Sequence, residues 1–211
     1  MFTGIIKEVG IVRNILKKPG KTEVEIYCSI CSEEIKEGSS IAIDGACLTV
    51  TEKGKSSFKV DIVEETLKKT TFSKIKINDR VNIELPLKLS ERFDGHIVQG
   101  HIDGTGKILK KKNLEGSTLI TIKLSEEMIP YIVEKGSICI DGISLTIANI
   151  EKEDITVSLI PYTLQNTSIG TKKVGDSVNI ELDIIGKYVN KVLTSQKEKI
   201  NKNFLKETGF L

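Results

Sequence analysis

The chain contains one pattern twice, with the copies about 97 residues apart. Residues 60–85 and 157–182 are identical at 11 of 26 positions, and both segments end in Val-Asn-Ile-Glu-Leu. At the same offset, Asp-Gly-Ala-Cys-Leu-Thr-Val at 44–50 corresponds to Asp-Gly-Ile-Ser-Leu-Thr-Ile at 141–147. Such ordered self-similarity is the signature of a duplicated structural unit. The chain must therefore fold into two related units that carry two related sites.

A third repeated block marks the start of each unit. The pattern Gly-x-Ile-x-x-x-Gly occurs at 4–10 and again at 100–106, an offset of 96. The change of one residue in the offset indicates an insertion, which we place at Ser39-Ser40, opposite the single Ser137. We expect units at residues 1–95 and 96–185 and a tail at 186–211, since about 100 residues is the commonest domain size.

Within each unit, short β-like runs alternate with turn signals. In the first unit we expect strands at 22–27, 40–43, 47–51, 58–63 and 80–85, separated by pairs such as Asp44-Gly45 and Lys53-Gly54. Short strands at this spacing predict an all-β fold with two small Greek-key barrels. The helical signals inside the units are confined to 32–37 and 125–134, each of which begins with Ser.

The tail has a different period. From residue 185 to 205 apolar side chains recur every three or four positions, and Asp183 can cap the start, which predicts an amphipathic helix. Its apolar stripe could pack on its own barrel or against the tails of other subunits. The sequence pattern leaves both partners open.

Composition excludes several classes of protein. Lys and Arg number 31 against 29 Asp and Glu, there is no Trp, and aromatic residues make up 5%, which disfavours a nucleic-acid surface. No apolar run approaches the roughly 18 residues needed to cross a bilayer, so we expect a soluble, cytoplasmic protein. Cys28 and Cys31 form an isolated C-x-x-C without a second pair, which indicates free thiols rather than zinc ligands.

Two matching positions carry different reactive groups. Cys47 and Ser144 occupy equivalent places after the Asp-Gly pair, and both can donate, accept or attack. The alternative is an ordinary turn, which Asp-Gly favours. The chain has only two histidines, His96 and His101, and the position that corresponds to His101 is Ile5. Because histidine is the usual proton carrier near neutral pH, the two sites must differ in proton chemistry.

Taken together, these motifs resemble the riboflavin synthase family. The resemblance extends from residue 1 to about 185 and rests on an ordered set: Met-Phe-Thr-Gly-Ile-Ile at 1–6, Gly-Ala-Cys-Leu-Thr-Val at 45–50, Glu-Thr-Leu at 65–67, Gly-His at 95–96, Gly-His-Ile at 100–102, Lys-Gly at 135–136 and Ile-Asp-Gly-Ile-Ser-Leu-Thr at 140–146.

The resemblance implies an assembly and a reaction. The family has two six-stranded barrels and a C-terminal helix, forms a homotrimer, and builds its active site between the N-terminal barrel of one subunit and the C-terminal barrel of its neighbour. Two molecules of 6,7-dimethyl-8-ribityllumazine exchange a four-carbon unit to give riboflavin and 5-amino-6-ribitylaminouracil, without a metal or redox cofactor. The resemblance also implies lumazine synthase as a further partner.

The resemblance also implies which residues bind substrate. The N-barrel site would use Gly4, Ile5, Ile6, Cys47, Leu48, Thr49, Asp61, Ile62, Val63, Glu64, Glu65 and Thr66. The C-barrel site would use Gly100, His101, Ile102, Lys135, Ser144, Leu145, Thr146, Leu159, Ile160, Pro161, Tyr162, Thr163 and Leu164. Cys47 and Ser144 would attack C7 of a lumazine or position the group that does. His101 would take a proton from the C7 methyl, with Thr146 nearby and Asp141 orienting Ser144.

One departure and one rival remain. Glu64-Glu65 in the first unit corresponds to Pro161-Tyr162 in the second, so the substrate contacts expected at these positions differ between the two sites. The rival is a carrier that binds lumazine or flavin without catalysis, such as the lumazine proteins of luminous bacteria. Because such carriers tend to lose the second site, the retention of Cys47, Ser144 and His101 favours an enzyme. An oligonucleotide-binding barrel is disfavoured by the charge and aromatic content.

Overall fold

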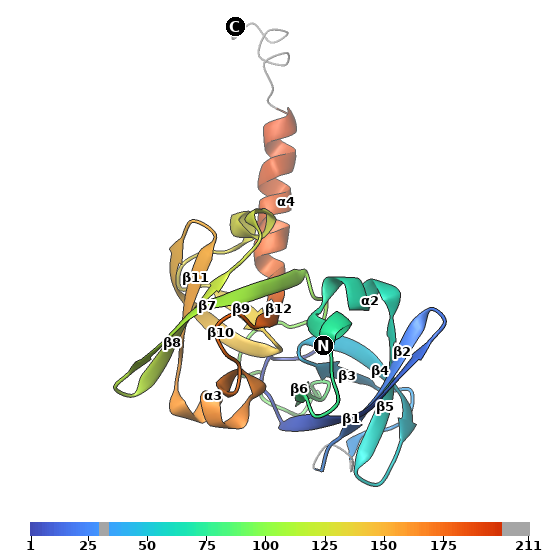
Figure 1. Cartoon of the computed structure of the whole chain (residues 1–211). Coiled ribbons are helices and arrows are strands. Elements are labelled where there is room, and N and C mark those ends of the chain that lie inside the picture. Colours follow the sequence, from blue (N-terminus) through green and yellow to red (C-terminus); the bar gives the residue numbers. More distant parts are fainter. Residues whose placement is uncertain (30–33, 200–211) are drawn as a thin grey trace, which may run out of the picture.

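The computed structural model describes residues 1–29 and 34–199. It contains two closed antiparallel barrels of six strands each, followed by a long helix (Figure 1), which confirms the predicted fold. The N-terminal barrel comprises β1 (Glu8–Lys18), β2 (Lys21–Tyr27), β3 (Ser40–Ile43), β4 (Ala46–Lys53), β5 (Ser57–Val63) and β6 (Arg80–Glu84). The C-terminal barrel comprises β7 (Gly104–Leu114), β8 (Ser117–Lys123), β9 (Ser137–Ile140), β10 (Ile143–Glu151), β11 (Asp154–Leu159) and β12 (Ser177–Leu182).

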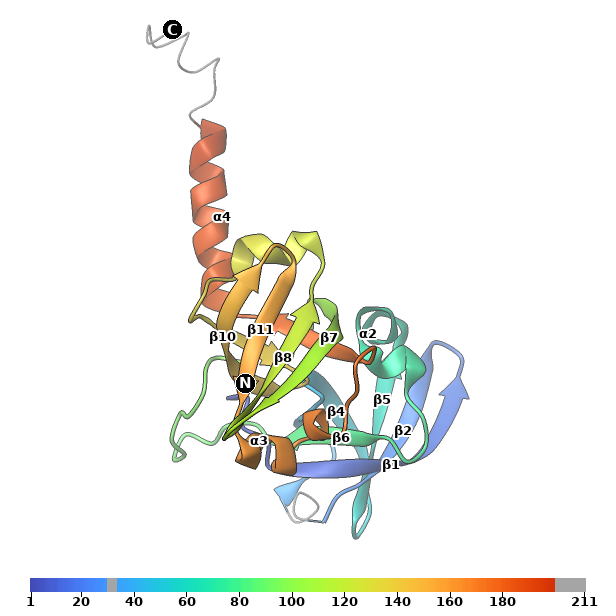
Figure 2. The same ribbon diagram turned by 60° about the vertical axis from the view of Figure 1, so that its left-hand side comes forward.

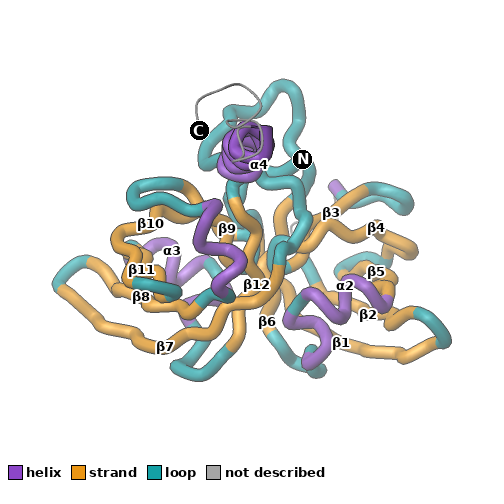
Figure 3. Tube along the Cα trace, turned by 90° about the horizontal axis from the view of Figure 1, so that it is seen from above, coloured by secondary structure: helices purple, strands orange, loops and turns teal. Residues whose placement is uncertain are grey.

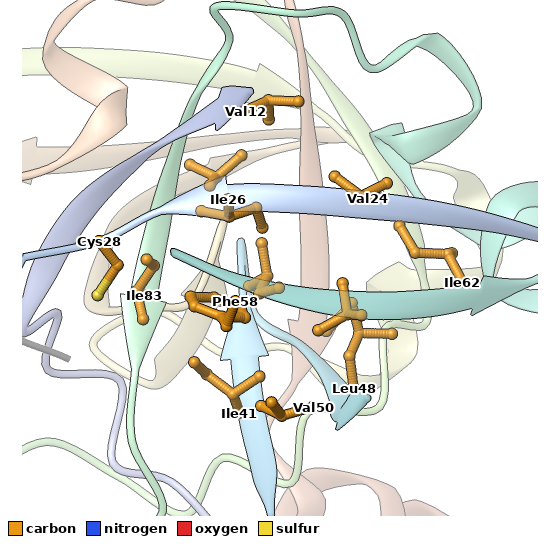
Figure 4. Close-up of a cluster of buried hydrophobic side chains, with 14 of the residues drawn as sticks. Val12, Val24, Ile26, Cys28, Ile41, Leu48, Val50, Phe58, Ile62 and Ile83 are labelled. Atoms are coloured by element: carbon orange, nitrogen blue, oxygen red, sulfur yellow. The ribbon is translucent and has the colours of Figure 1, made fainter. Parts of the chain in front are cut away.

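Alternating side chains fill each barrel. In β2 every second residue is buried, and the same alternation in β5 places Phe58, Val60 and Ile62 in the same core as Val24 and Ile26 (Figure 4). A fully buried side chain of this size contributes about 1.5–3 kcal/mol. Each barrel therefore has its own apolar core, as the repeat predicts.

β-Bulges occur at equivalent places in the two barrels. A bulge bends a strand and increases its twist, which helps a small sheet to close on itself. The register shifts lie between Val12 and Asn14 and between Val50 and Glu52 in the first barrel, and between Ile108 and Lys110 and between Ile147 and Asn149 in the second.

The short helices correct one expectation. Beyond η2 (Glu126–Tyr131), which lies in the predicted segment 125–134, the units contain α2 (Glu64–Lys69), η1 (Thr71–Lys74), α3 (Pro161–Asn166) and η3 (Ser168–Gly170). Confining the helical signals to two segments was therefore wrong. The N-cap residues Val63 and Ile160 make no side-chain cap bond, and six residues are too few for an apolar stripe. Residues 32 and 33 lie outside the described part of the chain.

The position of the insertion also differs from the expectation. The amide of Gly38 donates to the carbonyl of Val50, and the amide of Lys135 donates to Ile147, so the offset of 97 already holds before Ser39. The strands β2 and β8 still have the offset of 96. The rise to 97 means that the extra residue belongs to the second unit, between β8 and Lys135, and not to Ser39-Ser40 of the first. The correspondence is hidden because a left-handed position is glycine in one unit (Gly38, φ 80°) and lysine in the other (Lys135, φ 65°).

Two asparagines join the barrels across their shared seam. Asn82 on β6 accepts from the amide of Ser168 at 2.6 Å and donates to the carbonyl of Asp141 at 2.8 Å. Asn179 on β12 makes the matching pair, accepting from Thr71 at 2.7 Å and donating to Asp44 at 2.9 Å. These strands lie at the centre of the molecule (Figure 3). The reciprocal bonds fix one barrel relative to the other.

The helix α4 (Ile184–Lys199) projects away from both barrels (Figures 1 and 2). Asp183 accepts from the amide of Ile185 at 2.9 Å, which confirms the predicted cap. The side chains of Ile185, Tyr188, Val189, Val192 and Leu193 are each more than half exposed, so their own barrel does not cover the stripe. Residues 200–205 of the predicted helix lie outside the described part. Over residues 1–29 and 34–199, no helix is long and apolar enough to span a membrane.

Candidate active site

Two arms cross between the barrels. The N-arm (residues 2–6) precedes β1, and the C-arm (residues 98–102) precedes β7. They pair with each other through Phe2 and Val98. The amide of Ser144 in the C-barrel donates to the carbonyl of Gly4 at 2.8 Å, and the amide of Cys47 in the N-barrel donates to Gly100 at 2.9 Å. Each arm therefore lies on the β-strand that carries the reactive residue of the opposite barrel.

The crossing changes the predicted grouping of residues. Gly4–Ile6 does not join Cys47 as expected but joins Ser144, and Gly100–Ile102 joins Cys47. The apolar ends of the arms cross over in the same way. Ile6 packs on the C-barrel core, and Ile102 packs on the N-barrel core. The repeat shows which residues are equivalent but cannot show which barrel an arm covers.

Both contacts leave no room for a larger residue on the arm. A Cβ atom at Gly4 would lie 2.6 Å from Cβ of Ser144, and one at Gly100 would lie 2.4 Å from Cβ of Cys47. Both glycines also adopt positive φ angles, 79° and 84°. Glycine is thus required twice over at these positions, by space and by backbone conformation.

The Asp-Gly pairs form tight hairpin turns, as the alternative interpretation of the motif predicts. Asp44-Gly45 joins β3 to β4, Asp141-Gly142 joins β9 to β10, and all four residues have positive φ. The two turns meet at the seam, where a Cβ at Gly45 would lie 2.7 Å from the amide nitrogen of Gly142. The turns hold β4 and β10, which carry Cys47 and Ser144, close to the seam between the barrels.

Ser144 has a histidine partner that the sequence did not predict. The Nδ1 atom of His96 lies 2.6 Å from Oγ of Ser144, and the His96 side chain is buried. Burial lowers the pKa of His96, although the charge of Asp183 opposes this effect. A neutral imidazole at hydrogen-bond distance can take the hydroxyl proton as the serine oxygen attacks. This pair has the geometry of an activated nucleophile.

Asp141 does not take the predicted role of orienting Ser144. Its Oδ1 accepts from the amide of Asn179 at 2.7 Å, and its Oδ2 forms an ion pair with Lys172 at 3.0 Å. The carboxylate is fully buried in the seam. The turn directs it toward the inter-barrel contact, and His96 contacts Ser144 instead.

The C-arm carries His101 toward the N-barrel. The amide of His101 follows directly after Gly100, which contacts Cys47, and the His101 side chain is exposed. Cys47 is half-buried, and Thr49, two residues along β4, is exposed on the same face of the strand. The N-barrel site thus combines a thiol, a hydroxyl and a nearby imidazole.

In each barrel, the pairing with the next strand stops short of the reactive residue. Pairing of β4 with β5 runs from Lys53 and Phe58 to Val50 and Val60, so Cys47–Thr49 and Asp61–Val63 are not paired with each other. In the C-barrel, pairing of β10 with β11 likewise starts at Ile147 and Val157. Strand edges that part in this way can offer backbone groups to a flat heterocycle.

The remaining predicted residues divide by the direction of their side chains. Those that face the barrel cores can offer only backbone groups: Leu48, Leu145, Ile62, Leu159 and, on the helix, Leu164. Those at the surface are Val63, Glu64, Glu65, Thr146, Ile160, Pro161 and Tyr162, with Thr66 and Thr163 partly covered. Asp61 pairs with Lys21 through Oδ2 at 2.5 Å, and its Oδ1 is buried with no hydrogen-bond partner in the described chain. Lys135 donates to the carbonyl of Ala148 at 3.1 Å.

The sequence alone does not predict three functional candidates. It assigns no role to His96, because 48 residues separate it from Ser144 and only the crossing arms bring them together. Glu84 and Glu181 are buried acids that bind the arms. The sequence does contain a signal for these two buried acids. Both belong to the repeated Val-Asn-Ile-Glu-Leu, in which an acid interrupts an apolar strand.

The cysteines and acids show no metal site in the described segments 1–29 and 34–199, where no three His, Cys, Asp or Glu side chains are grouped to hold an ion. Cys28 is buried at the end of β2. Cys31, the other half of the C-x-x-C, lies outside these segments.

Comparison with known proteins first identifies the class. The family model described as the lumazine binding domain matches residues 3–86 and 99–183, one match for each barrel. Among solved structures, LumP complexed with 6,7-dimethyl-8-(1'-D-ribityl) lumazine has a TM-score of 0.79 at 24% identity and covers 86% of this chain and 98% of its own. LumP complexed with riboflavin has a TM-score of 0.81 at 24% identity, with 86% and 99% covered. The chain is a tandem pair of lumazine-binding domains.

The curated relatives identify the family. The riboflavin synthases of Actinobacillus pleuropneumoniae, Bacillus subtilis (strain 168) and Photobacterium phosphoreum are 43%, 39% and 35% identical to this chain, and each alignment covers 100% of both sequences. The chain belongs to the riboflavin synthase family.

Proposed function

We propose that this chain catalyses the dismutation of 6,7-dimethyl-8-ribityllumazine. Two molecules of this compound exchange a four-carbon unit and yield riboflavin and 5-amino-6-ribitylaminouracil, so that all atoms are conserved without an added oxidant. One substrate must be attacked at C7, an electrophilic imine carbon, and the other must lose a proton from its C7 methyl. The chemistry thus requires two sites for one ligand with different proton-handling groups.

The contact of His96 with Ser144 carries this proposal. At the C-barrel site, Ser144 is the nucleophile at C7 or positions it, and neutral His96 accepts the hydroxyl proton across 2.6 Å. The N-barrel site differs at this contact, because Cys47 takes the place of Ser144 there and Ile5 stands at the position that corresponds to His101. Duplicated sites that differ at this contact suit a reaction in which identical substrates take unequal roles.

At the N-barrel site, His101 is the base for the C7 methyl. The resulting carbanion is delocalised into the ring, so a modest base suffices. Cys47 lies beside the C-arm that bears His101, and Thr49 and Asp61 supply polar contacts for the ribityl hydroxyls. The buried Oδ1 of Asp61 is an acceptor that such a hydroxyl would satisfy.

The assembly we propose is a homotrimer in which an N-barrel faces a C-barrel of the next subunit. Two lumazines must meet face to face, and proximity is a large part of the rate of such a bimolecular step. The reactive strands border open surface, and the exposed apolar stripe of α4 offers a contact between subunits. Because the apolar stripe is uncovered in a single subunit, it favours a helix that packs against the tails of other subunits rather than one that packs on its own barrel.

The direct test is turnover of the purified chain. Incubation with 6,7-dimethyl-8-ribityllumazine should produce riboflavin, followed by its fluorescence, with two lumazines consumed for each riboflavin formed. Chromatography of the products should show 5-amino-6-ribitylaminouracil in equal amount. Tight lumazine binding with no riboflavin would contradict the proposal and identify a carrier.

A further inference from the structure

Two buried glutamates hold the arms. Glu84 on β6 accepts from the amide of Thr3 at 2.6 Å, from the Thr3 hydroxyl at 2.8 Å and from the amide of Gly4 at 3.0 Å. Its equivalent, Glu181 on β12, accepts from the amides of Gln99 at 2.7 Å, Gly100 at 2.9 Å and His101 at 3.1 Å. Each carboxyl group receives three donors from a single arm.

The chemistry of these contacts requires a carboxylate. An ionised carboxylate only accepts hydrogen bonds and offers about four lone-pair positions, which suits a cluster of converging N–H groups. A glutamine of the same size would turn an NH2 group toward at least one of these donors. The side chains of Glu84 and Glu181 are 3% and 2% exposed, so water cannot readily replace a lost bond.

The arms continue from these glutamates to the opposite barrel. From Glu181 in the C-barrel, the C-arm passes to the N-barrel, where the carbonyl of Gly100 accepts a hydrogen bond from the amide of Cys47. From Glu84 in the N-barrel, the N-arm passes to the C-barrel, where the carbonyl of Gly4 accepts a hydrogen bond from the amide of Ser144. The N-arm also supports the histidine pair, since the amide of His96 donates to the carbonyl of Thr3 at 3.2 Å.

We propose that Glu84 and Glu181 are positioning residues that act across the barrels, each holding the arm that completes the reactive site on the opposite barrel. Glu181 governs the surface around Cys47 and the placement of His101. Glu84 governs Gly4 and the backbone of His96, and through them Ser144. The roles of these sites in catalysis rest on the proposed function, but the positioning itself does not.

The test measures access to the Cys47 thiol in the full chain. A maleimide reagent is applied to the wild-type protein and to Glu181→Gln and Glu84→Gln, and the labelled peptides are quantified by mass spectrometry. Releasing the C-arm should expose Cys47, so Glu181→Gln should raise its labelling rate about tenfold or more. Glu84→Gln makes the same chemical change in the other barrel and should leave that rate within about twofold of wild type. These ratios correspond to loss or retention of one arm contact.

Equal rates for the two variants, or no increase in Glu181→Gln, would overturn the proposal. The buried thiol of Cys28 reports unfolding, because it lies in the N-barrel core and reacts only if that barrel opens. Cys139 does not serve as this control, since it packs against Phe2 and Val98 of the two arms. Should Glu181→Gln unfold, hydrogen exchange in the unmodified chain decides instead. The amides of residues 99–101 should then exchange as slowly as those of the barrel strands. Exchange as fast as in the exposed segment 90–94 would refute the proposal that Glu181 holds the C-arm.

A second readout separates positioning from mere structural support. Glu181→Gln should slow the exchange of the C7-methyl protons of bound lumazine, because it displaces the backbone of His101. Glu84→Gln, which displaces the backbone of His96, should lower kcat and leave that exchange near the wild-type rate. Equal exchange rates in the two variants would contradict the cross-barrel assignment. If the wild-type chain makes no riboflavin at all, the proposed function fails, while the labelling result still tests the positioning.

Discussion

The Nδ1 atom of His96 lies 2.6 Å from the Oγ atom of Ser144, and the two residues belong to the same half of the duplicated chain. The contact depends on the N-arm from the other half, because the amide of His96 is bonded to the carbonyl of Thr3. A reactive pair of the C-barrel is therefore assembled with help from the first residues of the chain.

Replacing His96 by Gln should lower kcat about 100-fold with little change in the Kd for riboflavin. The glutamine can still bond to Ser144 but cannot take its proton, and general base catalysis is typically worth about 10²–10⁴ in rate. Stopped-flow turnover and fluorescence titration measure the two quantities. A rise in Kd equal to the loss of kcat would show that His96 only supports ligand binding.

His101→Gln tests the other proton transfer. Because His101 lies on the arm that reaches the N-barrel, its loss should slow the exchange of C7-methyl protons of bound lumazine by about 100-fold, within the range for a general base. Proton NMR in heavy water follows this exchange. His96→Gln serves as the control, since it should leave the exchange near the wild-type rate. Unchanged exchange in His101→Gln would remove this residue from the role of base.

Cys47→Ala should reduce turnover about tenfold more than it weakens ligand binding, the mark of an interaction made mainly in the transition state. The backbone bond from Cys47 to Gly100 is unaffected by this change, so the C-arm should stay in place. Cys47→Ser should keep more activity than Cys47→Ala, because a serine stands at the equivalent position in the C-barrel. Equal losses of binding and turnover would indicate a packing role for the thiol.

The repeat predicted the barrels because strand periodicity and turn signals are local properties of the sequence. It could not predict the crossing of the arms, since Gly4 and Gly100 are equivalent and either barrel could have received either arm. The same limit misplaced His101 at the C-barrel site. Asp141 was misassigned for a different reason: its side chain, three positions from Ser144, could face either the site or the seam, and only the turn geometry decides.

Ionisation of Asp44 should make the stability of the chain fall as pH rises. Burial, followed by the nearby charge of Asp141, raises the pKa of Asp44 from its ordinary value of 3.8 to about 8. The folded chain therefore binds this proton more tightly than the unfolded chain. The contribution to stability is complete below pH 3.8, declines as pH rises toward 8, and is absent above it.

The variant Asp44→Asn isolates this effect. Asparagine keeps the acceptor for the amide of Asn82 and tolerates the positive φ of 42° at this position. Relative to wild type, its Tm should rise by about 3 °C per pH unit between pH 6 and 8 and then level off. Asp141→Asn is the contrast, because it removes the carboxylate that pairs with Lys172 and should lower Tm throughout pH 6–8. A Tm difference independent of pH would rule out titration of Asp44.

A chain that ends at Gly186 should keep both barrels and lose the proposed trimer. The deletion removes the exposed apolar side chains of Tyr188, Val189, Val192 and Leu193, each worth about 1.5–3 kcal/mol if buried between subunits, before the cost of assembly. It also removes the ion pair of Lys187 with Asp103, but a partly exposed pair contributes at most about 1 kcal/mol. Sedimentation should show monomers or weak oligomers that bind riboflavin and form it at less than about a tenth of the wild-type rate, one tenth being about 1.4 kcal/mol in the barrier. In the full-length chain, Val189→Lys with Val192→Lys should have the same effect, because both side chains are exposed in a single subunit and the change spares the barrels. Full activity from a chain shown to be monomeric would refute the site between subunits and leave the uncovered stripe of α4 to some other partner.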